Sequence, residues 1–133
     1  MTENIFKTME VSASGLRAEW VRMQVVANNV ANADTTETPQ GGPYQRQQVV
    51  FSTLMDGLNG VTVRGIMPSG APPRMVHNPG HPDANAEGYV AMPDVEVPLE
   101  MVDLMTATRA YEANLAAMKK FKDICEEALK LLR

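Results

Sequence analysis

The sequence predicts a mainly α-helical protein with a small β-rich insert, in which long N- and C-terminal helices pack as an antiparallel coiled coil with a small β unit between them. Apolar residues recur at alternating steps of three and four near both ends of the chain, as they do on one face of a helix. Residues 36–97, in contrast, contain eight of the nine prolines. We therefore expect two helical segments, residues 1–33 and 98–133, that form one core domain, and a β-rich or extended central region, residues 34–97.

The first predicted helix carries a heptad-spaced stripe. Its members are Phe6, Met9, Ala13, Leu16, Trp20, Met23, Ala27 and Val30. This spacing is typical of a helix that packs along a seam. Helix-stop signals follow at Asp34, Thr35 and Thr36, at Pro39, and at the pair Gly41 and Gly42. We expect this helix to cover residues 3–32.

The last predicted helix has a similar stripe with one change of phase. The stripe runs through Met101, Leu104, Thr108, Tyr111, Leu115, Met118, Lys122, Cys125, Leu129 and Leu132. From Met118 onward, a shifted stripe through Phe121, Cys125, Ala128 and Leu132 is more apolar. We expect a helix over residues 98–132. At ~1.5 Å per residue the two helices would be ~45 and ~50 Å long, so the central region is too small to cover both stripes.

The central region contains four short strand candidates. They are "YQRQQVVF" (44–51), "GVTVRGI" (60–66), "RMVHN" (74–78) and "GYVAM" (88–92). The segments "PSGAPPR" and "NPGHPDANAEG" have the proline and glycine content of an extended surface connection and of successive tight turns. A small unit of three or four strands is therefore predicted.

Composition excludes several classes of protein. A formal charge of −4 and a pI near 5.1 argue against sequence-independent binding of nucleic acid, which requires clustered basic residues. The single cysteine, Cys125, excludes an intrachain disulfide. Charged residues from Glu3 to Arg22 interrupt the first thirty residues, so we expect neither a cleavable signal peptide nor insertion into a membrane.

One cluster of side chains is compatible with metal chemistry. His77, His81, Asp83 and Glu87 lie within eleven residues and are of types that bind zinc or manganese. They lie in a turn-rich loop without the spacing of ligands on a helix, so turn polarity is the favoured interpretation. Cys125 lies on an apolar helical stripe, which favours a core or interface position over a nucleophile. We expect no enzymatic activity and no cofactor, and a metal-dependent enzyme using His77 and His81 is kept as an alternative.

Several segments together resemble a known family. "SASGLRAEWVRMQVVANNVANADT" (12–35) resembles the N-terminal signature of the axial proteins of the bacterial flagellum. "PYQRQQVVF" (43–51), "PPRMVHNPGHPDANAEGYVAMPDVEVPLEMVDLM" (72–105) and "ATRAYEAN" (107–114) narrow the resemblance to the proximal rod proteins of the flagellar basal body. Two features depart from the pattern, the pair Glu19 and Trp20 and the strongly charged end "KKFKDICEEALKLLR".

The resemblance implies a structural subunit of the proximal rod, the torque-transmitting drive shaft that spans the periplasm. Such a subunit would be exported by the flagellar type III machinery without a cleavable signal peptide. Its partners would be other copies of itself, the other proximal and distal rod proteins, and the protein at the junction of the rod with the MS ring. The alternative from a different class is a generic coiled-coil adaptor, which would show the same heptads.

The stripes and the asparagines at the end of the first helix are the expected subunit interface. Its predicted residues are Leu16, Trp20, Met23, Asn28, Asn29, Asn32, Leu104, Tyr111, Asn114, Leu115 and Met118. Two long helices with apolar seams and little cover within the chain are expected to pack on neighbouring copies. We expect the three asparagines both to cap the helix end and to donate hydrogen bonds across subunits. Simple termination of the helix is the alternative.

Overall fold

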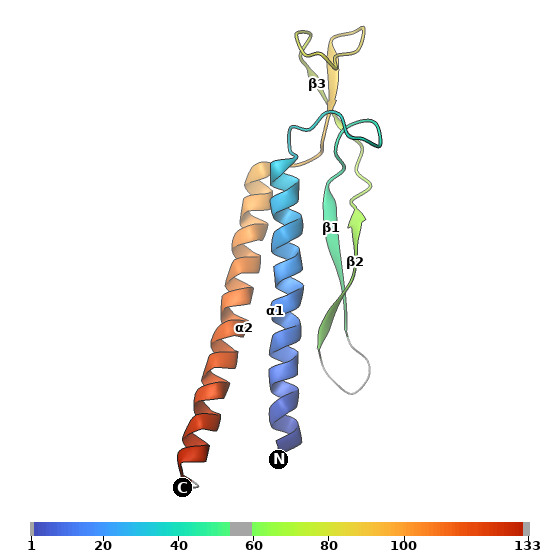
Figure 1. Cartoon of the computed structure of the whole chain (residues 1–133). Coiled ribbons are helices and arrows are strands. Elements are labelled where there is room, and N and C mark those ends of the chain that lie inside the picture. Colours follow the sequence, from blue (N-terminus) through green and yellow to red (C-terminus); the bar gives the residue numbers. More distant parts are fainter. Residues whose placement is uncertain (1, 54–59, 132–133) are drawn as a thin grey trace.

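The computed structural model describes residues 2–53 and 60–131. Over these residues the elements are α1 (Thr2–Ala31), β1 (Gln47–Thr53), β2 (Val61–Pro68), β3 (Arg74–His77), β4 (Tyr89–Met92) and α2 (Val97–Leu131). The two helices lie side by side and antiparallel, so the first turn of α1 and the last turn of α2 are at the same end of the molecule (Figure 1). The predicted fold class is confirmed, and both helices match the predicted bounds within one residue. Leu132, the last member of the predicted stripe, lies outside the described residues.

The end of α1 and the start of α2 each have a local cause. After Ala31 the backbone N–H of Thr35 donates to the carbonyl of Asn32, 3.1 Å away, and the chain leaves the helix in a turn. Gly41 and Gly42 follow with φ angles of 87° and 76°, a region that favours glycine. In the first turn of α2, Pro98 occupies a position where no intrahelical partner exists for a backbone N–H, so its missing donor costs nothing.

The four strands form two separate antiparallel hairpins rather than one sheet. In the first, Gln47 pairs with Pro68 and Thr53 with Val61, and the register shifts between Val50 and Phe51. In the second, Arg74 pairs with Met92. The sequence predicts one small unit of three or four strands, and the structure differs in this respect. The connection between the two hairpins contains Pro72 and Pro73, which have no N–H to donate to a strand ladder.

The hairpins take different positions relative to the helices. The β1–β2 hairpin extends along α1, whereas β3 and β4 lie beyond the end where α1 finishes and α2 begins (Figure 1). The backbone N–H of Val61 donates a hydrogen bond to Ser14 Oγ at 3.1 Å, and this bond connects the start of β2 to α1. Among the described residues, β1 and β2 pack against α1, and neither packs against α2.

The buried core is small, and it contains mostly small or polar side chains. The buried residues include Ala18, Val25, Val26, Ala33, Val90, Val95 and Ala107, together with Ser14, Asn29 and Glu100. Larger apolar residues such as Phe6, Trp20 and Leu99 are more than half exposed. No helix in the described part of the chain is long and apolar enough to cross a membrane. The apolar content of the helices is therefore mostly on the surface of this chain.

Candidate assembly surface and the polar network beside it

The two helices meet along small and polar residues. A Cβ added to Gly15 would lie 2.8 Å from Nδ2 of Asn114, so the helix backbones approach closely there. Further along, Arg22 lies 3.4 Å from Asp103, and Asn29 Nδ2 lies 3.1 Å from Glu100. These three α1 residues are seven apart, which is the heptad spacing of a coiled-coil seam. Ala107, between the α2 partners, is completely buried.

This seam is offset by one residue from both predicted stripes. Leu16 and Met23 each follow a seam residue of α1, and Leu104 and Leu115 each follow a seam residue of α2. One residue is a rotation of about 100° around a helix. Because the helices are antiparallel, the same offset turns both stripes to the same side of the pair. The Thr108 hydroxyl, 3.5 Å from Sδ of Met23, joins the two stripes.

We call this surface the shared face. It consists of Leu16, Trp20 and Met23 on α1 and Met101, Leu104, Thr108, Tyr111 and Leu115 on α2. Trp20 is 54% exposed and Met101 48%, and the other members are half-buried. The β1–β2 hairpin packs on α1 through other residues, among them Ser14 and Val25. The shared face is thus a continuous apolar surface built from both helices.

Asn29 connects three elements through a fully used side-chain amide. Its Nδ2 donates to the carbonyl of Gln47 at 2.8 Å and to Oε2 of Glu100 at 3.1 Å. Its Oδ1 accepts from the Tyr44 hydroxyl and from the backbone N–H of Gln47, both at 2.9 Å. An amide has two donor hydrogens and two acceptor lone pairs, so all of its capacity is satisfied within the chain. Asn29 is 1% exposed.

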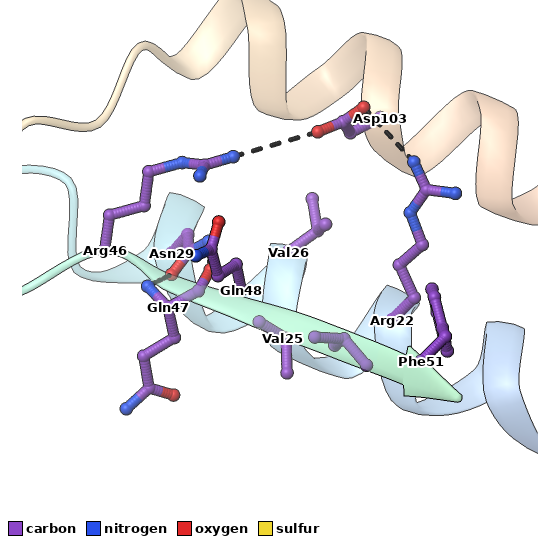
Figure 2. A pocket seen from close by; sticks show the side chains of 10 residues that line it. Arg22, Val25, Val26, Asn29, Arg46, Gln47, Gln48, Phe51 and Asp103 are labelled. Carbon is purple, nitrogen blue, oxygen red and sulfur yellow. Dashed lines mark hydrogen bonds and ion pairs between the residues drawn. The ribbon is translucent and has the colours of Figure 1, made fainter. Parts of the chain in front are cut away.

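Charged residues extend this network across the helix pair. The Glu100 side chain, 1% exposed, accepts a hydrogen bond from Arg46 Nε at 2.6 Å. Arg46 and Arg22 both reach Asp103, at 3.8 and 3.4 Å, along a groove of about 320 Å³ between α1, β1 and α2 (Figure 2). A buried carboxylate is stable only when it is paired and hydrogen-bonded, which Arg46 and Asn29 provide. Burial, and then the charge of Glu100, raises the pKa of Tyr44.

The other two asparagines have different surroundings. Asn32 Nδ2 donates to the carbonyl of Asn28 at 2.9 Å, and Asn32 Oδ1 accepts from the Thr35 hydroxyl at 3.2 Å. Asn32 therefore caps the helix end, as expected. Asn28 is exposed. The expectation that asparagines bond across subunits stays a prediction, and Asn28 and Asn32 are the two with access to a neighbour.

The remaining predicted residues are placed as follows. Asn114 lies on the helix–helix seam against Gly15. Met118 is half-buried, as are Phe121 and Cys125 of the shifted stripe. Sequence reasoning missed Gly15, Tyr44, Arg46 and Glu100. Gly15, a glycine in the middle of a long helix, is the one signal that could have indicated close helix packing.

The side chains of His77, His81 and Asp83 make contacts within the turn-rich loop. The ring of His77 packs edge-on against Tyr89 with centroids 5.0 Å apart. His81 Nδ1 accepts the backbone N–H of Asp83, whose carboxylate accepts from the Thr36 hydroxyl at 2.7 Å. Within the described ranges, no group of three or more His, Cys, Asp or Glu side chains is arranged to hold a metal ion. Turn polarity, the favoured interpretation, agrees with these contacts.

Comparisons with known proteins agree with the architecture. Residues 9–37, covering most of α1 and its terminal turn, match the family described as flagella basal body rod protein. Residues 86–131, covering β4 and α2, match the family described as flagellar basal body rod FlgEFG protein C-terminal.

Similar proteins match nearly the whole chain. The flagellar basal-body rod protein FlgC of Salmonella typhimurium is 40% identical over 131 residues, covering 96% of each chain. The FlgC of Bacillus subtilis is 41% identical, covering 95% of this chain and 97% of the relative. That of Borreliella burgdorferi is 35% identical, covering 97% and 98%. The resemblance seen in the sequence is confirmed, and the chain belongs to the family of the flagellar basal-body rod protein FlgC.

Proposed function

We propose that this protein is a structural subunit of the proximal rod of the flagellar basal body, where it helps to transmit torque. Family membership over nearly the full length supports the rod assignment. The proposed partners are other copies of the chain, the other rod proteins and the protein at the junction with the MS ring. Export by the flagellar type III machinery would bring the chain to the periplasm.

One structural observation carries this proposal. The helices use small and polar residues for each other, and the large apolar residues of the shared face stay half-buried or exposed. Burying a Leu, Met or Trp side chain gives ~1.5–3 kcal/mol, so several of them on one face favour association strongly. A protein that functioned alone would be expected to turn this face inward.

The groove in Figure 2 fits a supporting role better than a catalytic one. Its charged side chains, Arg22, Arg46 and Asp103, pair with one another. Asp103 and the neighbouring Glu100 are both paired with arginine. The ion pairs along the groove therefore help to hold α1, β1 and α2 in their relative positions. The shared face is formed by α1 and α2 in this arrangement.

The test is a substitution on the shared face. Leu115→Asp places a carboxylate where a neighbouring subunit would pack, at a cost of several kcal/mol if it stays charged and unpaired. We expect the variant to be synthesised and exported but to be absent from purified basal bodies, and the cells to be non-motile. Leu115→Met, which keeps the apolar volume, is the control and should assemble. Normal basal bodies containing the Leu115→Asp chain would refute the proposed interface.

A further inference from the structure

The ion-pair network beside the groove contains more carboxylates than arginines. Its members are Glu19, Glu100 and Asp103 on the negative side and Arg22 and Arg46 on the positive side. Within residues 2–53 and 60–131 these side chains form ion pairs only with one another. Three negative and two positive charges leave the network with a net charge of −1. The network is therefore short of one cation.

Asp103 is the surplus carboxylate, because each arginine also has a carboxylate of its own. Arg46 Nε lies 2.6 Å from Glu100, and Arg22 Nη1 lies 3.7 Å from Glu19. The two arginines reach Asp103 at 3.4 and 3.8 Å. Both distances exceed the ~2.7–2.9 Å of a well-formed hydrogen bond between charged groups. Neither arginine would be left without a partner if Asp103 paired with another cation.

Asp103 is also the accessible carboxylate of the three. Its side chain is 43% exposed, compared with 18% for Glu19 and 1% for Glu100. It lies at the groove between α1, β1 and α2, which is also lined by the exposed residues Gln48 and Phe51 (Figure 2). A side chain from outside can therefore reach Asp103 without any displacement of the helices or of β1.

Glu19 has an acceptor that the folded chain does not use. In the part of the chain that the structure describes, its Oε2 is the only buried side-chain nitrogen or oxygen without a hydrogen bond. A buried acceptor without a donor is unfavourable. If an outside cation paired with Asp103, Arg22 would be free to move from Asp103 toward this oxygen. Every carboxylate of the network would then have a positive partner.

The groove lies on a different side of α1 from the shared face. Each residue of a helix is rotated by about 100° from the one before it. Relative to Arg22, Val25 in the groove is therefore about 60° to one side, and Met23 of the shared face is about 100° to the other. A neighbour in the groove is thus a second contact, distinct from one on the shared face. An open, head-to-tail assembly requires two different contact surfaces on each subunit.

We propose that a lysine or arginine side chain of a neighbouring rod subunit enters this groove and pairs with Asp103. This inference rests on the proposed function and adds a polar contact to the apolar contact of the shared face. Charge complementarity selects the occupant, because a cation neutralises the network whereas an acidic side chain would add to its negative charge. A side chain is favoured over a bare metal ion, since the described residues hold no group of three or more His, Cys, Asp or Glu arranged to bind one.

Asp103→Asn tests whether the carboxylate acts between subunits or within the chain. The amide keeps an oxygen for Arg22, and both arginines keep their other carboxylates, so the urea midpoint of the purified chain should stay nearly unchanged. The yield of basal bodies should fall at least about fivefold, because the incoming cation loses its partner. Asp123→Asn, the same change at an exposed position of α2, is the control and should assemble normally.

Two results of this comparison would overturn the proposal. A normal yield from Asp103→Asn would show that no neighbour depends on the carboxylate. A midpoint that falls together with the yield would show that Asp103 acts within the folded chain. Absence of even the tagged unsubstituted chain from basal bodies would instead contradict the proposed function.

A photo-crosslinking amino acid at Gln48 identifies the incoming side chain in assembled basal bodies. We expect an adduct to a segment of a neighbouring subunit that contains a lysine or arginine, and mass spectrometry shows whether that subunit is a second copy or another rod protein. No adduct, or an adduct to a segment without a basic residue, would contradict the proposal.

A charge exchange then tests the pair itself. Asp103→Lys should lower the yield of basal bodies at least about tenfold, because it places like charges opposite each other. Replacing the crosslinked lysine or arginine by aspartate should lower the yield as well. The two changes together should restore most of it, and a combined variant no better than either single variant would refute the pairing.

Discussion

Replacing Asn29 by alanine should destabilise the folded chain far more than the same change at its neighbour Asn28. Asn29 is 1% exposed and makes four hydrogen bonds, which join the end of α1 to Gln47, Tyr44 and Glu100. Removing the amide leaves polar groups of all three partners unpaired. A buried unpaired group costs ~1–3 kcal/mol, partly relieved here because the adjoining groove admits water.

The expected net loss is about 3–5 kcal/mol. Alanine is a better helix former than asparagine by roughly 0.5 kcal/mol, and this gain is small beside the lost hydrogen bonds. Because domains of this size are stable by ~5–15 kcal/mol, the loss is a large fraction of the total. Asn28→Ala has the same gain in helix propensity at an exposed position, so it should be neutral or slightly stabilising.

Urea unfolding of the purified chain, followed by far-UV circular dichroism, measures both variants. With a slope of ~1–3 kcal/mol per molar urea, Asn29→Ala should lower the midpoint by roughly 2 M. Asn29→Asp should be at least as destabilising, because it places a second carboxylate beside Glu100 and removes the Nδ2 donor. Equal midpoints for Asn28→Ala and Asn29→Ala would refute the reasoning, since the two differ only in the contacts assigned here.

Three further predictions follow from individual contacts. Gly15→Leu should cost ~1–3 kcal/mol by overpacking against Asn114, whereas Gly15→Ala should change stability by less than ~1 kcal/mol because only the flexible amide end of Asn114 must move; urea midpoints check both. The raised pKa of Tyr44 favours the neutral form in the folded state, so its contribution to stability is complete below the unfolded pKa of about 10 and is lost as the pH rises through the folded value. Unfolding between pH 8 and 11 should show this alkaline loss in the unsubstituted chain, and Tyr44→Phe should reduce it. Replacing Asn28 and Asn32 together by alanine should raise the helicity of a peptide covering residues 2–36 while lowering the resistance of basal bodies to denaturant; unchanged resistance would leave only the capping role.

The helices could be predicted from the sequence because spacing alone identifies them. Steps of three and four over Phe6–Val30 and beyond Met101 specify helical period, and proline and glycine specify where the period ends. The four strands could be located because short apolar or alternating runs lie between segments rich in proline and glycine. The prediction of one β unit did not anticipate two separate hairpins, because strand patterns give no information on which strands pair.

The contacts within the site could not be predicted, because they join residues far apart in the chain. Asn28, Asn29 and Asn32 are chemically identical side chains at one helix end, and only the packing of β1 beside α1 selects Asn29 for the network. Glu100 in a first helical turn is normally explained by the helix dipole, which gives no reason to expect an arginine 54 residues earlier as its partner.

The offset between the apolar stripes and the seam explains why a rod subunit keeps polar residues between its own helices. Stripes of Leu and Met tolerate sliding, since apolar side chains pack acceptably in several alignments. Two polar pairs, Arg22 with Asp103 and Asn29 with Glu100, form in one alignment of the helices only. If α1 slid by one turn along α2, each charge or amide would lose its partner. The seam thereby fixes the register of α1 against α2 and with it the relative position of Met23 and Thr108. Only a chain with that register fixed presents the shared face as one surface, and the apolar residues of that face are then available for the proposed contacts with neighbouring subunits.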